Sequence, residues 1–173
     1  ILEKYDSQPL EQDTVTIEGN IFFQNETALL PTVVKKLIII KNNVKKKLKV
    51  LQVGTSEYKD VKKMYDAVKS VVNSAYGVFG NRFFRLYNNK VASATTFLVR
   101  DLLKYVKNKL EEKGHPVIYV DTDSVFIQSK ENLTELCNQI VNDWAKKYGK
   151  NKTNIQFEYE GVFEQILILT KCR

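Results

Sequence analysis

The sequence predicts a protein of the α+β class, with amphipathic helices and short antiparallel hairpins in separate parts of the chain. The first observation is helical periodicity, because apolar residues recur at every third or fourth position over residues 30–51, 58–72 and 132–148. The second is two pairs of short β-branched and aromatic runs separated by turn residues, at 15–23 and 117–127. With 173 residues, 43% of them hydrophobic, the chain suits one compact domain or two small lobes that share a core.

Composition narrows the class of function. The formal net charge of +7 indicates a polyanionic partner, although a basic surface alone is a weak indication. The two cysteines, Cys137 and Cys172, are far apart, which argues against a disulfide framework and favours a reducing compartment. No apolar run approaches the roughly 20 residues that span a bilayer, and no signal-peptide pattern occurs. We therefore expect no membrane partner and an intracellular location, cytoplasmic in a prokaryote and nuclear or viral otherwise. Because residue 1 is Ile, we expect a piece of a longer protein.

The N-terminal part predicts a loop followed by a hairpin. Residues 1–13 are polar and contain Pro9, as is typical of a loop. The runs Val15–Ile17 and Ile21–Phe23 are separated by Glu18-Gly19-Asn20, which predicts a small antiparallel hairpin.

Two helices follow, joined by a short link. The first ends at Val53-Gly54-Thr55-Ser56, where Gly54 suits a C-cap and Ser56 suits the N-cap of the second. A short link between two such helices gives an antiparallel helical hairpin. The second helix is expected to end or bend at Gly77 and Gly80. A third, long helix is predicted over residues 91–113.

Lysines crowd the first helix. Seven lie between residues 35 and 49, and no acidic residue occurs between Glu26 and Glu57. A solvated lysine face is the usual explanation for such a helix. However, like charges this dense lower helix stability, and a bound anion would offset that loss.

The lysines of the two helices can converge. If the apex of the helical hairpin lies near Gly54, then Lys41 and Lys69 stand at the same height. Lys45 lies one helical turn from Lys41 on the same face. On the second helix, Asn73 lies one turn from Lys69. Three ammonium groups can then meet on one polyphosphate, for which lysine serves as a point charge.

The second strand hairpin carries two carboxylates at its tip. The runs Val117–Val120 and Val125–Ile127 are apolar enough to predict buried strands that hold the tip rigidly. The residues between them, Asp121-Thr122-Asp123-Ser124, are compatible with an ordinary turn. Two neighbouring carboxylates repel each other unless a cation or a proton intervenes, so a metal site is the functional alternative.

The C-terminal part predicts a helix and an apolar end. The helix over 132–148 places Cys137 on its apolar face, so we expect a core residue and not a nucleophile. Ile155–Tyr159 predicts a strand, and Val162–Leu169 follows as a nearly continuous apolar run. Lys171 and Arg173 come after this run, either as a polar terminus or as cations that reach a backbone phosphate.

Four motifs, in order along the chain, resemble those of family B DNA polymerases. Lys69–Gly77 fits the pattern K-x-x-x-N-S-x-Y-G at every fixed position, and Tyr119–Ser124 fits Y-x-D-T-D-S equally well. Leu29–Pro31 is similar to the I/L-L-P that opens the fingers of that family, and Thr170–Arg173 is similar to the start of its T-K-K-R-Y segment. The resemblance covers nearly the whole chain from about Gly19.

The resemblance implies an architecture and an activity. Antiparallel helical-hairpin fingers would be inserted in part of a polymerase palm, whose β-hairpin bears the DTD motif. Residues 1–28 would lead from the palm into the fingers, residues 29–77 would form the fingers, and residues 78–173 would form part of the palm. The activity would be DNA-directed nucleotidyl transfer from dNTPs to a primer 3′ end with two Mg²⁺ ions. The partners would be primer-template DNA, dNTPs and the remainder of a polymerase chain.

The resemblance also assigns roles to the matched positions. Asp123 would ligate the catalytic metal ions, with Asp121 supporting it or ligating loosely. Tyr76 would face the nascent base pair, Lys171 would hold the primer-template, and Arg173 is assigned to DNA binding with it. The residues that would bind the triphosphate are Lys41, Lys45, Lys69 and Asn73. Lys41 stands where the family usually has Arg, so the bidentate fork is lost there.

One expected segment does not occur in the chain. The other metal-binding motif of the family, D-x-x-S-L-Y-P, should lie before residue 1. Two-metal catalysis needs carboxylates from both palm motifs to fix two cations about 4 Å apart. We therefore expect the isolated chain to be inactive. The alternative is a non-catalytic basic module that binds nucleic acid and derives from a polymerase, which explains the charge of +7 but leaves the polar residues of both motifs without a function.

Overall fold

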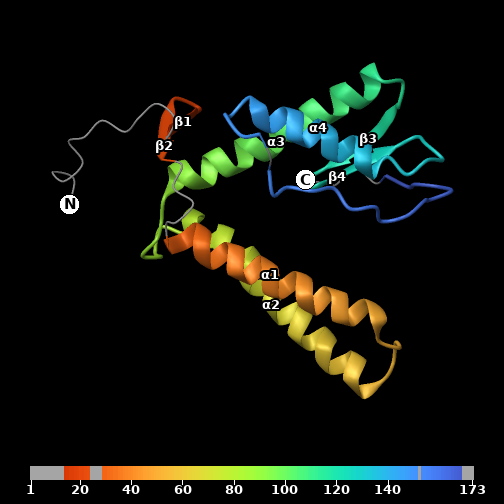
Figure 1. The fold of residues 1–173 in the computed structure, drawn as a ribbon. Coiled ribbons are helices and arrows are strands. Elements are labelled where there is room, and N and C mark those ends of the chain that lie inside the picture. Colours follow the sequence, from red (N-terminus) through yellow and green to blue (C-terminus); the bar gives the residue numbers. More distant parts are fainter. Residues whose placement is uncertain (1–13, 24–28, 152, 169–173) are drawn as a thin grey trace. The chain divides into compact units, whose positions relative to one another are not determined.

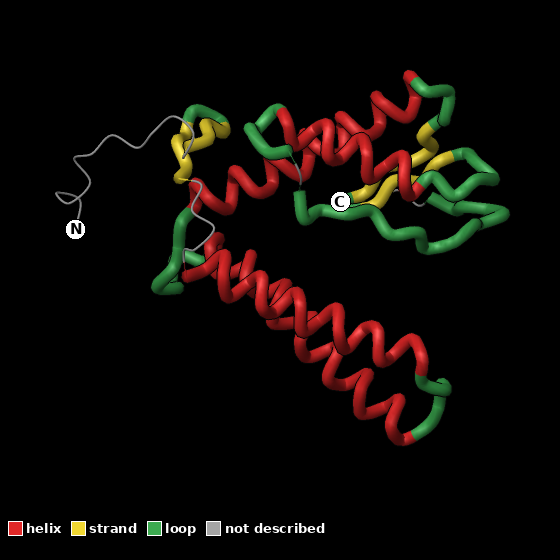
Figure 2. Tube along the Cα trace, in the orientation of Figure 1, coloured by secondary structure: helices red, strands yellow, loops and turns green. Residues whose placement is uncertain are grey.

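The computed structural model describes residues 14–23, 29–151 and 153–168. The elements in chain order are β1 (Thr14–Ile17), β2 (Asn20–Phe23), α1 (Leu29–Val50), α2 (Ser56–Gly80), α3 (Asn89–Glu112), β3 (Val117–Asp121), β4 (Ser124–Ile127) and α4 (Thr134–Lys146). The strands form two separate two-stranded antiparallel sheets (Figure 2). This mixture of helices and small antiparallel sheets agrees with the predicted α+β class (Figure 1).

The chain divides into two compact units, residues 1–96 and residues 97–173. Helix α3 begins in the first unit and ends in the second. Nowhere in the described ranges is a helix long and apolar enough to cross a membrane.

The first unit contains the β1–β2 hairpin. Ile17 pairs with Asn20, which leaves Glu18 and Gly19 as a two-residue turn in place of the expected three. Both turn residues have positive φ, 48° for Glu18 and 73° for Gly19, as a tight hairpin turn of matching twist requires. The Glu18 carboxylate accepts a hydrogen bond of 3.1 Å from the Ser93 hydroxyl, which ties the hairpin to the beginning of α3.

Helices α1 and α2 pack against each other as the predicted helical hairpin (Figure 1). Val44 is buried, and the other α1 residues that recur with it at three and four positions are half-buried, at Val34, Leu37, Lys41 and Leu48. Lys41 therefore occupies a position in this apolar stripe.

The link between α1 and α2 corrects both expected caps. Thr55, and not Ser56, is the N-cap of α2, because its hydroxyl oxygen accepts a hydrogen bond of 3.1 Å from the Tyr58 backbone N–H. Ser56 is the first residue of the helix. Gly54 lies four residues after Val50, the last residue of α1, so it is not the C-cap of that helix. Its φ of 95°, a conformation that favours glycine, instead places it in the turn of the link.

Helix α2 is not interrupted at Gly77, the first of the two glycines at which it was expected to end or bend. It continues through Gly77 and ends at Gly80, with Asn81 as its C-cap. A glycine in a helix costs conformational entropy but keeps its N–H donor, so it weakens the helix without interrupting its hydrogen bonds.

The core of the second unit lies between α3 and α4. It consists of Leu102, Val106 and Leu110 from α3 and Cys137, Ile140, Val141, Trp144 and Ala145 from α4. Cys137 is 5% exposed, and burial raises the pKa of its thiol. The prediction that Cys137 is a core residue is therefore confirmed.

Asp101, in the middle of α3, links that helix to the end of α4. Its Oδ2 accepts hydrogen bonds from Trp144 Nε1 at 2.7 Å, from Tyr148 Oη at 2.9 Å and from Lys147 Nζ at 3.3 Å. The Tyr148 ring also packs against the Trp144 ring in a tilted arrangement, with centroids 5.1 Å apart. A single carboxylate thus joins α3 to the C-terminal end of α4.

The β3–β4 hairpin packs one face on this core. Val117, Val125 and Ile127 contact it. The expectation of buried strands is wrong for Ile118, which is 55% exposed, and for Tyr119, which is 37% exposed. The register shifts between Val117 and Tyr119, and such an irregularity interrupts the alternation of covered and exposed residues.

The predicted strand at Ile155–Tyr159 is absent from the structure, which has no helix or strand in residues 153–168. The reason is a competing partner for the backbone of Phe157. Asn138 of α4 accepts a hydrogen bond from Phe157 N at 2.8 Å and donates one to Phe157 O at 3.3 Å. The side-chain amide therefore occupies both groups that a strand ladder would need.

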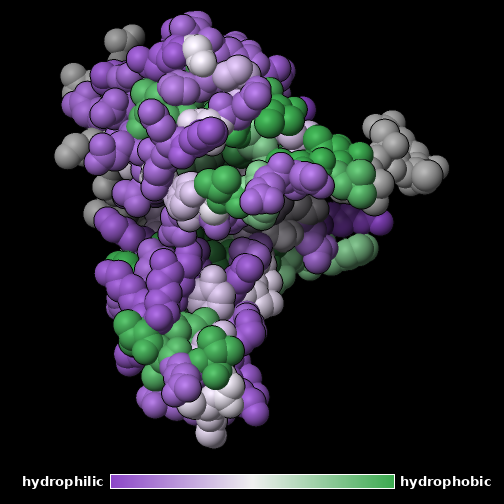
Figure 3. Space-filling model, turned by 90° about the vertical axis from the view of Figure 1, so that its right-hand side faces the viewer, coloured by the Kyte–Doolittle hydropathy of each residue, from purple (hydrophilic) through white to green (hydrophobic). Residues whose placement is uncertain are grey.

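Beyond this anchor the apolar run is exposed. Val162, Phe163 and Leu167 are 67%, 60% and 84% exposed. Hydrophobic residues are visible at the surface among hydrophilic ones (Figure 3).

Candidate active site

The site begins with the turn of the β3–β4 hairpin. Asp121 pairs with Ser124, so Thr122 and Asp123 are the two turn residues. The paired runs Val117–Asp121 and Ser124–Ile127 fix this register, because a slip by one residue would turn their apolar side chains away from the core. Both aspartates are exposed at the tip.

The Asp121 carboxylate helps to shape the turn. Its Oδ1 accepts hydrogen bonds from Thr122 N at 2.8 Å and from Thr122 Oγ1 at 3.2 Å. A carboxylate that accepts from its own turn is the usual Asx arrangement. Asp121 thus has a structural function in the turn, and Asp123 is the second of the two turn residues.

The pair of carboxylates meets part of the requirement for a divalent cation. Mg²⁺ is commonly bound by one or two carboxylates together with substrate phosphates and water, so Asp121 and Asp123 suit such an ion. No group of three or more His, Cys, Asp or Glu side chains that could hold a metal occurs in the part of the chain that the structure describes. Among these residues, a cation at the turn would therefore depend on ligands from a substrate or another segment.

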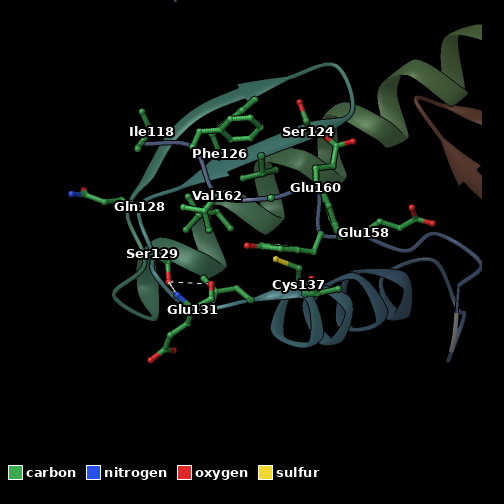
Figure 4. Close-up of a pocket in the computed structure, with 18 of the residues that line it drawn as sticks. Ile118, Ser124, Phe126, Gln128, Ser129, Glu131, Cys137, Glu158, Glu160 and Val162 are labelled. Carbon is green, nitrogen blue, oxygen red and sulfur yellow. Dashed lines mark hydrogen bonds between the residues drawn. The ribbon is translucent and has the colours of Figure 1, made fainter. Parts of the chain in front are cut away.

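A cavity of about 760 Å³ lies beside the hairpin, and Asp123 is one of the residues that line it. Figure 4 shows Phe126 of β4, Cys137 of α4 and Val162 of the last segment on its walls. Five carboxylates line the cavity, from Asp123, Glu131, Glu158, Glu160 and Glu164, against one lysine, Lys130. This excess of negative charge does not suit a nucleoside triphosphate.

The predicted triphosphate residues lie on the two helices of the first unit. Lys41 and Lys45 of α1 are half-buried, and Lys69 and Asn73 of α2 are exposed. Tyr76, four residues before the end of α2, is 46% exposed. Because α1 and α2 pack against each other, both helices contribute to one hairpin, but the convergence of these side chains on a single ligand stays a prediction.

The predicted DNA contacts cannot be placed, because Lys171 and Arg173 lie outside the described residues.

Asn138 and Asp101 did not stand out from the sequence. Asn138 bonds to a backbone 19 residues further along, and Asp101 meets side chains 43 to 47 residues away. Neither contact has a spacing that a periodic pattern can indicate. Their only local signal is a polar residue within an amphipathic helix, which is common.

Comparison with known proteins gives consistent matches. A sequence model described as DNA polymerase family B matches residues 2–173. The DNA polymerase alpha catalytic subunit of Xenopus laevis is 27% identical over 146 residues, covering 84% of this chain and 10% of that protein. DNA polymerase II of Escherichia coli is 29% identical over 120 residues, covering 63% of this chain and 15% of that protein.

A solved structure is similar as well. The family B DNA polymerase from the hyperthermophilic archaeon Pyrobaculum calidifontis matches with a TM-score of 0.60 and 26% identity, covering 88% of this chain and 20% of that one. The chain thus spans about a tenth to a fifth of the length of such relatives. The match over residues 2–173 confirms the resemblance drawn from the motifs: the chain belongs to DNA polymerase family B.

Proposed function

We propose that this chain forms the fingers and part of the palm of a longer DNA polymerase, which transfers nucleotides from dNTPs to a primer 3′ end on a DNA template. In this proposal residues 1–28 lead from the palm into the fingers, residues 29–77 are the fingers, and residues 78–173 belong to the palm. The observation that carries the proposal is the β3–β4 hairpin of a family B chain, whose register leaves Asp121 and Asp123 exposed at a two-residue turn.

In the proposed mechanism, Asp121 and Asp123 hold Mg²⁺ together with carboxylates from another part of the polymerase. Bound Mg²⁺ would stabilise the negative charge that develops on the transferred phosphate. Asp121 accepts hydrogen bonds from Thr122, so its carboxylate is oriented before any cation arrives. Asp123 has no such contact to a turn residue among those described, which leaves its carboxylate available for ligation.

The helical hairpin would supply the charges for the incoming nucleotide. Lys41, Lys45 and Lys69 would neutralise the triphosphate and the leaving pyrophosphate as point charges. Asn73 lies one turn from Lys69 on α2 and would add an uncharged donor. Tyr76, at the next turn, would contact the nascent base pair. Lys171 and Arg173 would bind the phosphate backbone of the primer-template.

The test is Asp123→Asn in the polymerase that contains this chain. The amide keeps the size of the side chain but cannot serve as an anionic ligand, so kcat for single-nucleotide incorporation should fall by at least about a hundredfold. Primer-template affinity should stay within about threefold, because the change removes no contact to DNA. Asp143→Asn is the matched control, since it makes the same change at an exposed residue of α4 that pairs with Lys146. Incorporation that survives in Asp123→Asn would overturn the assignment.

A non-catalytic module that binds nucleic acid is the second candidate, favoured by the lack of a group of three metal ligands in the described ranges. The two candidates differ in nucleotide binding. A polymerase should bind dNTP saturably and in a Mg²⁺-dependent way, and Lys69→Ala should abolish this binding. A non-catalytic module should show no Mg²⁺-dependent dNTP binding, either with the natural sequence or with Lys69→Ala.

A further inference from the structure

The net charge of the protein resides entirely in one helix. Helix α1 contains seven lysines and no acidic residue. The whole chain has 27 basic and 20 acidic residues, so the rest of the chain has 20 of each and is formally neutral. The charge of +7 is therefore a property of α1 and not of the protein surface in general.

Four of these lysines lie away from the packed side of the helix. Lys35 and Lys46 are eleven residues apart, close to three whole turns, so they share one side of α1 about 16 Å from each other. Lys36 and Lys47 repeat this spacing one residue further on. All four are exposed, and so are Asn42 and Asn43, which lie between them on the same side. We call these four lysines the outer lysine surface.

The outer lysine surface is separate from the proposed nucleotide residues of α1. Lys41 and Lys45 are half-buried and belong to the side that includes the buried Val44. At 100° per residue, the packed stripe of Val34, Leu37, Lys41, Val44 and Leu48 spans about 80° of the helical projection. The four lysines of the outer surface point about 100° to 160° away from the centre of that stripe. A triphosphate held by Lys41 therefore leaves the outer surface unused.

On α2 and α3, two lysines of each helix are paired with acids. Lys62 pairs with Asp66 and Lys63 with Asp60 on α2, each at 3.7 Å. On α3, Lys107 pairs with Glu111 at 3.8 Å and Lys109 with Glu112 at 2.6 Å. Among the described residues, none of the four lysines of the outer surface forms an ion pair. Unrelieved repulsion lowers helix stability, so an external anion is the missing partner.

We propose that the outer lysine surface binds the phosphate backbone of double-stranded DNA. Its rows of ammonium groups suit a linear polyanion, and duplex DNA carries one charge per about 1.7 Å of axis. Helix α1 contains no aromatic residue, so it offers no platform for stacking the bases of a single strand. Contacts to phosphates carry no sequence information, so we expect this binding to have no sequence preference.

An anionic membrane is the competing partner. A helix that lies on a membrane buries its apolar face in the lipid. The apolar stripe of α1 instead packs against α2, with Val44 5% exposed. Ile38, Ile39 and Ile40 are 38%, 52% and 43% exposed, so lipid binding is one arm of the test.

The experiment compares two variants of the 173-residue chain that carry the same charge. The first replaces Lys35, Lys36, Lys46 and Lys47 with Gln. The control replaces the four ion-paired lysines, Lys62, Lys63, Lys107 and Lys109, with Gln. Both lower the formal charge from +7 to +3, and Gln keeps good helix propensity. Circular dichroism and thermal unfolding verify that each variant is folded.

Binding is measured by fluorescence anisotropy with a labelled duplex of mixed sequence over a series of salt concentrations. The slope of log K against log salt concentration changes by about 0.9 for each phosphate contact. The first variant lacks four lysines, so the magnitude of its slope should be smaller by about 3 to 4. Its affinity near 0.1 M salt should fall at least about tenfold, and the control should keep most of the slope.

Three outcomes would overturn the proposal. Equal losses in both variants would assign DNA binding to net charge, and an unchanged slope in the first variant would place the contacts elsewhere. A greater loss for a labelled single strand, or for vesicles containing phosphatidylserine, than for the duplex would assign the surface to that partner. None of these measurements involves catalysis, so they remain decisive if the proposed polymerase function fails.

Discussion

At the scale of single residues, the Asp101 carboxylate is a hydrogen-bond acceptor for several side chains of the second unit. Three donors meet one carboxylate oxygen, and its side chain is 27% exposed. Hydrogen bonds to a charged, partly buried group contribute more than those between neutral groups. Asp101 therefore stabilises the contact between α3 and α4, on whose core the β3–β4 hairpin packs.

Asp101→Ala should lower the free energy of unfolding by about 2 kcal/mol, because Trp144 and Tyr148 lose their acceptor in a partly buried place. Urea unfolding followed by tryptophan fluorescence measures the change, since Trp144 is the single tryptophan. Asp143→Ala is the control, because Asp143 is exposed and its ion pair with Lys146 should contribute little to stability. Equal effects of the two substitutions would contradict the prediction.

The contribution of Asp101 should also depend on pH. Burial raises the pKa of Asp101, but the hydrogen bonds from Trp144, Tyr148 and Lys147 outweigh burial, and the pKa lies below its ordinary 3.8. This stability is therefore present above pH 3.8 and is lost as the pH falls through the folded-state pKa.

Tyr148, which donates to Asp101, sets the upper end of the pH range in which this bond stabilises the fold. Burial, and then the bond to Asp101, raise the pKa of Tyr148 from 10.0 to about 12. Its contribution is complete below pH 10 and is lost as the pH rises toward 12. The difference in unfolding free energy between the natural chain and Asp101→Ala should thus be constant from about pH 5 to 9 and shrink at both ends. A difference that grows at low pH would contradict this assignment.

At the scale of elements, the amide of Asn138 holds the segment that follows α4. Asn138→Ala removes both bonds to Phe157, so protection of the Phe157 amide from hydrogen exchange should fall roughly fivefold to tenfold. Asn138→Asp keeps the acceptor for Phe157 N–H and should retain most of the protection. Gln139→Ala, which removes an exposed amide from the same helix, is the control. Unchanged protection in Asn138→Ala would show that the segment is held by packing of Phe157 alone.

Substitution of Gly77 in α2 should affect helix stability and nucleotide incorporation in opposite directions. Its φ is not positive, and a Cβ there would meet nothing within 4 Å, so Gly77→Ala should stabilise the chain by about 0.5–1 kcal/mol. If the glycine of the family motif gives room to nucleotide or DNA, the same change should lower nucleotide incorporation by the polymerase. Ser70→Ala on the same helix is the control and should leave incorporation unchanged. Thermal unfolding and single-nucleotide incorporation measure the two effects, and a loss of stability would contradict the prediction.

The elements with local signals could be predicted from the sequence. The periodicity that ends at Gly54 and at Gly114 places α1 and α3 within about two residues of their observed bounds. The turn residues likewise place both hairpins. The strand at residues 155–159 was wrong because Asn138, far away in sequence, takes the backbone bonds of Phe157. Local propensity carries no information about such a competitor.

The candidate site could be predicted only in part. The turn position of Asp121 and Asp123 follows from the strands around them, and the structure agrees. Whether Lys41, Lys69 and Asn73 bind one ligand depends on side-chain positions that helix register alone does not determine. That the strands would leave some of their residues exposed depends on what packs against them, which strand composition does not reveal.

At the scale of the whole molecule, charge and carboxylates are distributed unequally. Helix α1 carries the net positive charge in the first unit, and the paired aspartates of the hairpin turn lie in the second. Polymerisation needs two cations held by carboxylates and a polyanionic substrate held by basic groups. The basic groups are present in excess, whereas the described residues offer no group of three metal ligands. We therefore expect carboxylates, and not lysines, to limit the activity of these 173 residues on their own.

The isolated chain should consequently fail to extend a primer. A primer-template with dNTPs and Mg²⁺ should yield no product above background, because two cations about 4 Å apart need more carboxylates than Asp121 and Asp123 supply. The polymerase that contains the chain is the positive control at equal concentration. Asp123→Asn in the isolated chain identifies contamination, since product that persists in this variant comes from another enzyme. Product made by the natural chain and lost in Asp123→Asn would contradict the prediction and show that these residues form a complete active site, alone or as an assembly of copies.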